Sequence, residues 1–177
     1  MVVVGKNVDP KTDGTGNAPI SWVANELLNT SHMMNRTRVA WTNTSMRSYL
    51  IETIFPLIPS VVRNRILSVR KTSANGMDGP SHTDWSDETI WIPSYREAVA
   101  DTGAELWTKG GATYPILQQN TGGIRKKHKA NSTTNIFWWL RSWSNSSGDT
   151  YRCIQESGGY AVAICNRQEG VCIGFCT

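Results

Sequence analysis

Residues 137–177 constrain the fold of this chain more than any other stretch. They hold all four cysteines and three of the eight tryptophans, and their three arginines are balanced by three acidic residues. An apolar run lies at each end, FWWL at 137–140 and GVCIGFC at 170–176, whereas the residues between them are polar and varied. This pattern predicts two buried apolar segments that enclose a variable segment of no net charge.

The two apolar runs are predicted to be strands. FWWL is too short and too aromatic for a helix, which favours a buried strand. Residues 171–176 form the second strand, with Val171, Ile173 and Phe175 on one side and the cysteines on the other. Because a free cysteine behaves as a small buried hydrophobe, both faces of this strand are expected to be covered.

Residues 151–166 between them are predicted to form a hairpin. Its turn is Ser157-Gly158-Gly159, because glycine tolerates the positive φ that tight hairpin turns need. Four small or apolar side chains are expected to face a core: Cys153, Ala161, Ala163 and Cys165. The other residues of the hairpin follow no such pattern.

These motifs resemble those of a known family. WWLRS (138–142), the Ser/Asn tract after it and GVCIGFC resemble the C-terminal repeat region of a large phage and bacterial domain family. That family has a C-type-lectin-like fold related to the formylglycine-generating-enzyme fold. WTNTSMRSYL (41–50) and IWIPSYREA (90–98) resemble further marks of it, so the likeness covers roughly residues 18–177. The resemblance implies an α+β domain with small antiparallel sheets, two or three short helices and long irregular loops.

Many proteins with this ending are targets of diversity-generating retroelements, in which adenine-directed mutagenesis rewrites chosen codons of the C-terminal repeat. Template versions of the repeat tend to be rich in asparagine, whereas this chain holds varied residues there. The resemblance therefore implies a ligand-binding surface that has already been diversified. Its predicted residues are Trp143, Asp149, Thr150, Tyr151, Arg152, Gln155, Glu156, Tyr160, Val162, Ile164, Arg167 and Gln168.

The predicted function is recognition of a host-cell surface protein or glycan, by the tip of a phage tail fibre or by a bacterial surface protein. Paratopes favour Tyr, Trp, Ser, Gly, Asn and Arg, and these types recur among the predicted positions. Packing within the hairpin is the alternative for the aromatic residues, and still more for Val162 and Ile164. Both a monomer and a homotrimer remain open, and a structural virion component without a ligand is a further alternative.

No catalytic residue and no cofactor are expected. His32, His82 and His128 lie in polar surroundings without a nucleophile-base motif. A formylglycine-generating-type oxidase would need a reactive cysteine pair. Cys172 and Cys176 lie roughly 13 Å apart at ~3.3 Å per residue, too far to bridge, which favours buried structural thiols. A Cys153–Cys165 disulfide across the hairpin is the alternative if the protein is exported.

The upstream part completes one α+β domain, residues 1–177, with a strand and loop at 1–17 and the variable region at 138–177. Residues 9–17 and 72–87 are predicted as loops, and 103–134 as an irregular segment anchored by Trp107, Tyr114, Ile116 and Leu117. Thr44 or Asn43 caps the first helix and Pro56 stops it, while Ser94 and Glu97 form a capping box in the third. Strands are expected at 2–5, 20–23, 27–28, 66–70 and 90–92, and helices at 44–55, 59–65 and 94–100.

Charge and composition suggest no nucleic-acid partner, no metal and no membrane insertion. The net charge of +4 arises upstream, and Arg125, Lys126, Lys127 and Lys129 are interpreted as a solvated basic loop rather than a phosphate-binding patch. His82, Asp84 and Asp87 lack the further ligands of a metal site. The Met1-Val4 run is too short for a signal peptide, and no stretch is long enough to cross a membrane.

Overall fold

The computed structural model describes residues 1–74, 83–99, 112–144 and 148–177, and within them the chain is a mixed α+β structure of small antiparallel sheets. The strands are β1 (Val2–Pro10), β2 (Asn17–Val23), β3 (Val69–Ala74), β4 (Thr83–Glu88), β5 (Trp138–Trp143), β6 (Thr150–Ile154), β7 (Tyr160–Ile164) and β8 (Gly174–Cys176). The α-helices are α1 (Ser45–Tyr49), α2 (Ser60–Arg63), α3 (Tyr95–Ala98) and α4 (Pro115–Gln118).

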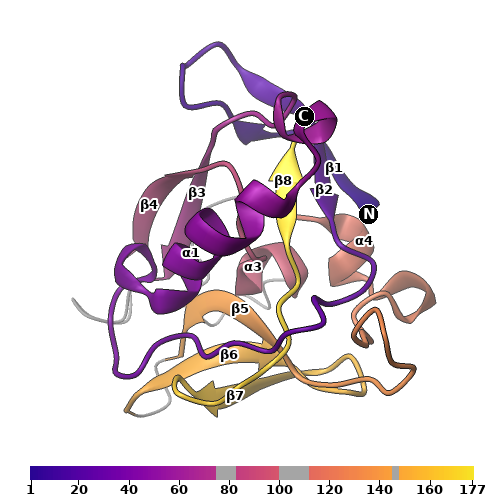
Figure 1. Cartoon of the computed structure of the whole chain (residues 1–177). Helices are drawn as coiled ribbons and strands as arrows, with labels where there is room; N and C mark the ends of the chain where they lie inside the picture. Colours follow the sequence, from indigo (N-terminus) through magenta and orange to yellow (C-terminus); the bar gives the residue numbers. More distant parts are fainter. Residues whose placement is uncertain (75–82, 100–111, 145–147) are drawn as a thin grey trace.

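The strands form three sheets, ordered β1-β2-β8, β3-β4 and β5-β6-β7. In Figure 1 the β5-β6-β7 sheet lies at the bottom of the view and the β1-β2-β8 sheet towards the top, with α1 in front. Two groups of buried side chains fill the interior. One contains Trp91, Tyr114 and Trp138, and the other, which lies between α1 and the β5-β6-β7 sheet, contains Met46 and Trp139.

The chain returns at β8 to pair with β2. Ser21 lies opposite Cys176 and Val23 opposite Gly174, in antiparallel register. Gly174 also exchanges two backbone hydrogen bonds with Trp91, at 3.0 and 2.7 Å. A Cβ atom at Gly174 would lie 2.3 Å from the Trp91 ring, so the glycine of the GVCIGFC motif is required by this close approach.

The predicted strand at 171–176 is confirmed over residues 174–176, while residues 171–173 are irregular. The expectation that both of its faces are covered is confirmed. Val171, Cys172 and Cys176 are fully buried, and Phe175 is nearly so.

The predicted helix at 44–55 is confirmed, including its cap. Thr44 accepts a hydrogen bond from the Arg47 N–H at 3.2 Å, as an N-cap residue does. After Tyr49 the helix widens into a π-helical turn at Leu50–Ile54, and it ends in a 3₁₀ turn at Phe55–Leu57 around Pro56.

The capping box at Ser94 is also confirmed. The Glu97 N–H donates to Ser94 Oγ at 3.2 Å, and the Ser94 N–H donates to Glu97 Oε2 at 2.7 Å. The helix that it begins is shorter than predicted, because α3 ends at Ala98. The second predicted helix is confirmed as α2 at Ser60–Arg63.

Several predicted strands need correction. Residues 27–28 and 90–92 contribute only a single bridge each, at Leu27 and Trp91, and are otherwise irregular. Leu27 and residues 90–92 are buried in the core as irregular backbone and Leu28 is half-buried, so burial rather than strand pairing explains the apolar composition of these runs. The strand predicted at 66–70 begins at Val69, and the one predicted at 2–5 extends to Pro10, which shortens the predicted 9–17 loop.

A buried network of charges joins the sheets. The Arg141 guanidinium of β5 makes two hydrogen bonds to the Glu97 carboxylate, at 2.6 and 2.8 Å, and also donates to the carbonyls of Ile92 and Thr72. Lys71 Nζ lies 3.1 Å from Glu97 and 2.6 Å from Asp9. Burial alone would raise the pKa of the Glu97 carboxyl, but Arg141 and Lys71 together hold it below its usual range.

Candidate ligand-binding surface

The hairpin predicted at 151–166 is confirmed as β6 and β7. Its strands pair in regular antiparallel register from Thr150 opposite Ile164 to Ile154 opposite Tyr160. The turn closes with a hydrogen bond from the Gln155 N–H to the Gly159 carbonyl at 2.8 Å. Gly158 has a φ of +84°, which is the positive value expected of a glycine in this turn.

One face of the hairpin packs on the core. Cys153, Ala163 and Cys165 are buried there, as predicted. Tyr151 is buried with them, and its hydroxyl donates a hydrogen bond to the Val39 carbonyl. Tyr151 and Cys153 are two residues apart on one strand and therefore share a face. The alternation of side chains along the strand thus predicts that Tyr151 is buried.

The prediction of a solvent-facing position is therefore wrong for Tyr151, and also for Trp143 and Arg152. Trp143 is 8% exposed in the same buried group, with the Arg38 guanidinium 4.6 Å from its ring centroid. A large aromatic side chain gains more free energy from burial in the core than most other side chains do. This gain explains why residue types that are frequent in paratopes are buried here.

The opposite, outer face of β7 is exposed. Tyr160 is 52% exposed, Val162 39% and Ile164 54%. Packing in the core was the alternative for Val162 and Ile164, and the structure instead directs both outward. The alternation along β7 explains this, because Ala161 and Ala163 occupy the inner face. Three large side chains, all with apolar bodies, are thus presented side by side to solvent.

Arg152 supports this outer face from the neighbouring strand. It lies directly opposite Val162 and is 6% exposed. Its guanidinium lies 4.9 Å from the ring centroid of Tyr95 and 5.9 Å from that of Tyr160. The two tyrosine rings meet edge to face at 5.4 Å. Cation–π and aromatic contacts of this kind restrain Tyr160. No local sequence pattern predicts the contact between Tyr95 and Tyr160.

The remaining predicted residues lie at the two ends of the hairpin. Gln155 and Glu156 are in the β6–β7 turn, half-buried and exposed respectively. At the other end, Thr150 is half-buried, and three residues are exposed: Asp149, Arg167 and Gln168. Arg167 pairs with Glu169 at 2.9 Å. The structure thus brings Tyr160, Val162 and Ile164 together on one face and separates the two ends by the length of the strands.

The four cysteines are free and buried. Burial raises the pKa of the Cys153 and Cys176 thiols to about 12 and also raises those of Cys165 and Cys172. These thiols are therefore protonated at neutral pH, whereas a reactive cysteine needs its thiolate.

The basic segment needs one correction. Lys127 is fully buried rather than solvated, and its ammonium donates to the carbonyls of Ala24 at 2.6 Å and Asn25 at 3.1 Å. Such backbone carbonyls satisfy a buried ammonium without a phosphate. Lys126 is exposed, and Arg125 and Lys129 are half-buried.

The loop predicted at 72–87 is wrong where the structure describes it, because residues 72–74 belong to β3 and residues 83–87 to β4. The segment predicted to be irregular at 103–134 contains the short helix α4. His82 and Trp107 lie outside the described residues, while Asp87 pairs with Arg70 at 3.2 Å. Across the ranges that the structure describes, no group of three or more His, Cys, Asp and Glu side chains converges as a metal site requires. Tyr114 and Leu117 are fully buried, as expected of anchors.

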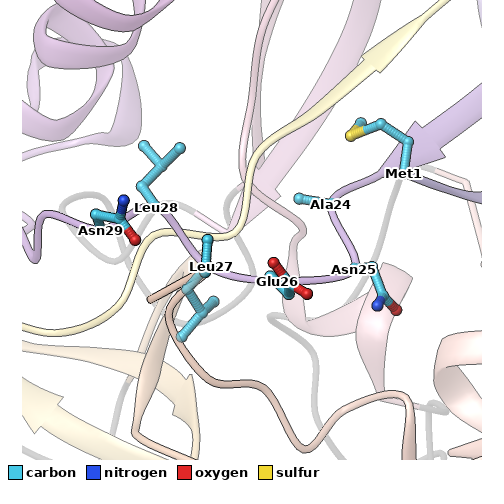
Figure 2. Close-up of a pocket in the computed structure, with 8 residues that line it drawn as sticks. Met1, Ala24, Asn25, Glu26, Leu27, Leu28 and Asn29 are labelled. Atoms are coloured by element: carbon cyan, nitrogen blue, oxygen red, sulfur yellow. The ribbon is translucent and has the colours of Figure 1, made fainter. Parts of the chain in front are cut away.

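A pocket of about 500 Å³ lies away from the hairpin, lined by Met1, residues 24–29 and Ala130. Figure 2 shows Leu27 and Leu28 extending to opposite sides of the segment that forms its wall. The lining offers the Glu26 carboxylate and no nucleophile. It contains none of the predicted ligand-binding residues, so the β7 face is the better candidate site.

Comparisons with known proteins give a family match. A family model described as a domain of unknown function (DUF6273) matches residues 22–176. Neither the curated proteins nor the solved structures contain a match to the chain. None of the helices in the described ranges has the length and apolar character needed to span a membrane.

Proposed function

We propose that this chain, which belongs to the family described as a domain of unknown function (DUF6273), is a ligand-recognition protein that binds through the outer face of β7. The observation that carries the proposal is the exposure of Tyr160, Val162 and Ile164 on a strand whose other face is buried. Contiguous exposed apolar side chains on a soluble surface are typical of interaction sites.

The contrast in burial between the two sequence motifs and the predicted variable positions supports the proposal. Residues of the WWLRS and GVCIGFC motifs such as Trp138, Arg141 and Cys172 are fully buried. Seven of the twelve positions predicted to vary are exposed: Asp149, Glu156, Tyr160, Val162, Ile164, Arg167 and Gln168. Substitution at these exposed positions would leave the packing of the buried motif residues intact. A surface can be diversified only if its substitutions leave the core packed.

The proposal extends to the type of fold and to the biological role. The WWLRS and GVCIGFC motifs resemble the C-type-lectin-like variable proteins of diversity-generating retroelements. We infer a C-type-lectin-like fold and a role in attachment to a host-cell surface protein or glycan, on a phage tail fibre or a bacterial surface. The small antiparallel sheets are compatible with that fold.

Two measurements test the proposal. The first is the DNA beside the gene, where we expect a reverse transcriptase and a near-copy of the repeat encoding residues 138–177 that differs only at adenines. The differing codons should include those of Tyr160, Val162 and Ile164. Absence of both would remove the claim of diversification.

The second measurement is binding of the purified protein to displayed surface proteins and to a glycan array. We expect Val162→Asp to abolish binding that the wild type shows, because it places a charge at the centre of the exposed face. Val61→Asp, the same substitution at an exposed valine of α2, is the control and should bind as the wild type does. Equal binding by all three proteins would contradict the proposal.

A further inference from the structure

The open edge of β7 carries a further inference. In the β5-β6-β7 sheet, β7 is an outer strand, and Figure 1 places it at the lower margin of the molecule. Among the residues that the structure describes, no strand pairs with its second side. The backbone groups on that side decide what can bind there.

The hydrogen-bonding pattern of the hairpin shows which groups these are. Gln155 N–H donates to the Gly159 carbonyl, and Cys165 N–H donates to the Asp149 carbonyl at 2.7 Å. These two pairs continue the β6–β7 register by one residue at each end. Opposite pairs in an antiparallel ladder alternate between bonded and non-bonded, so the pairs of Ala161 and Ala163 are bonded to β6. The N–H and C=O groups of the residues between them therefore point away from β6.

Those residues are Tyr160, Val162 and Ile164, whose side chains are also exposed. At the end of the strand, the Ile164 carbonyl accepts a hydrogen bond from the Arg167 N–H at 3.0 Å. The N–H groups of Tyr160, Val162 and Ile164 and the carbonyls of Tyr160 and Val162 line the open edge. Side-chain and main-chain binding groups thus come from the same three residues.

Among the described residues, β7 itself carries no charged residue, proline or β-bulge that would hinder strand pairing. Exposed edges are normally blunted by lysine, by proline or by a β-bulge. The β7 sequence YAVAI contains no charged residue and no proline, and its register with β6 is continuous. By contrast, the β5–β6 pairing contains a register shift between Trp139 and Trp143.

We propose that β7 binds its partner by strand addition, in which an extended polypeptide segment pairs with residues 160–164. The proposal rests on the function proposed above, and it narrows the partner from a protein or glycan to a polypeptide. Alternating donors and acceptors at strand spacing match another peptide backbone, and alternate apolar side chains of the segment would lie beside Tyr160, Val162 and Ile164. A sugar would need converging polar side chains, whereas this row offers only the Tyr160 hydroxyl.

Strand addition also fits a surface that is diversified. Main-chain hydrogen bonds give affinity whatever the side chains are, and the side chains set specificity. The side chains at positions 160, 162 and 164 can therefore change without loss of the edge that holds the partner.

The test begins with displayed linear peptides of random sequence, selected on the immobilised wild-type protein. We expect enriched peptides to carry apolar residues at alternate positions. A synthetic copy of an enriched peptide is then methylated at one backbone amide at a time. Methylation of an amide that faces β7 should weaken binding about tenfold, because one hydrogen bond is lost and the methyl group clashes. Methylation of the intervening amides should have little effect.

Two variants at Val162 separate the main chain from the side chain. Val162→Ala removes the apolar side chain and keeps the N–H, whereas Val162→Pro also removes the N–H. Because this N–H points away from β6, proline there leaves the β6–β7 hydrogen bonds in place. We expect Val162→Pro to bind the peptide about tenfold more weakly than Val162→Ala, with unchanged near-UV circular dichroism. The methylated peptides give the same information on the wild-type protein if Val162→Pro does not fold.

Four results would overturn strand addition. These are the failure to enrich any linear peptide, equal binding by Val162→Pro and Val162→Ala, insensitivity to methylation, and a wild-type dimer that Val162→Asp dissociates in sedimentation experiments. In the last case the edge would serve a second copy of the chain. If a peptide or glycan still binds the wild type and fails to bind Val162→Asp, the recognition surface stands and only the mode of binding is refuted.

Discussion

Replacing Arg141 by leucine should be among the most damaging single changes in the described part of the chain. The Arg141 and Glu97 side chains are both completely buried. The substitution would leave the Glu97 carboxylate buried with Lys71 as its remaining charged partner. Breaking a buried ion pair by removal of one partner costs about 3–5 kcal/mol, which is a large share of the roughly 5–15 kcal/mol that stabilises a typical domain.

Urea unfolding followed by tryptophan fluorescence measures this loss. With a urea dependence of about 1–3 kcal/mol per molar, the midpoint should fall by roughly 1 M or more. The control is Arg70→Leu, which removes the same charge from an ion pair whose side chains are 45% and 44% exposed. An exposed pair contributes roughly 1 kcal/mol or less.

A second substitution distinguishes an unpaired charge from lost packing. In the Arg141→Leu background, Glu97→Gln removes the stranded carboxylate and should recover part of the lost free energy of unfolding. If Arg141→Leu costs no more than Arg70→Leu, or if Glu97→Gln lowers stability further, our account of the network is refuted.

Because the folded-state pKa values of Asp9 and Glu97 are lowered, the free energy of unfolding should fall as the pH drops below about 4, and Glu97→Gln should flatten that fall in urea titrations. Burial raises the pKa of the Cys153 and Cys176 thiols to about 12 in the folded protein, whereas an unfolded thiol titrates at about pH 8.5. The free energy of unfolding should therefore decline above about pH 8.5, by about 1.4 kcal/mol per pH unit for each thiol. A Cys153→Ala variant whose free energy of unfolding declines with the same slope would contradict this. Tyr151→Ala should cost about 3–5 kcal/mol, whereas Tyr160→Ala should cost roughly 1 kcal/mol or less, as thermal unfolding of the two variants would show.

Local rules predicted the parts of the fold that depend on neighbouring residues. The Thr44 cap, the Ser94–Glu97 capping box and the turn at Gly158 are each determined within a few residues, and each is confirmed. The β6–β7 hairpin followed from the same kind of signal, since a glycine turn lies between two runs of strand-forming residues.

Longer-range relations were beyond local rules. Nothing near Arg141 in the sequence identifies Glu97 as its partner, because the pair forms only when β5 packs beside α3. In the candidate site, the alternation of side chains along each strand predicts which residues are buried better than residue type does. Tyr151 is predicted to face solvent because the resemblance places it among the variable positions and because its side chain is of a type common in paratopes. It is buried, and it shares a strand face with Cys153. The apolar Val162 lies outside because Ala161 and Ala163 occupy the inner face.

The pairing of β8 with β2 has a consequence for synthesis of the chain. Ser21 and Cys176 are hydrogen-bonded neighbours separated by 155 positions in the sequence. During translation, the edge of β2 that pairs with β8 therefore stays unpaired until residues 174–176 have left the ribosome. Contacts this distant in sequence slow folding and prolong the exposure of unpaired strands. The nascent protein should accordingly depend on chaperones more than a domain of equal size whose strands pair with their sequence neighbours.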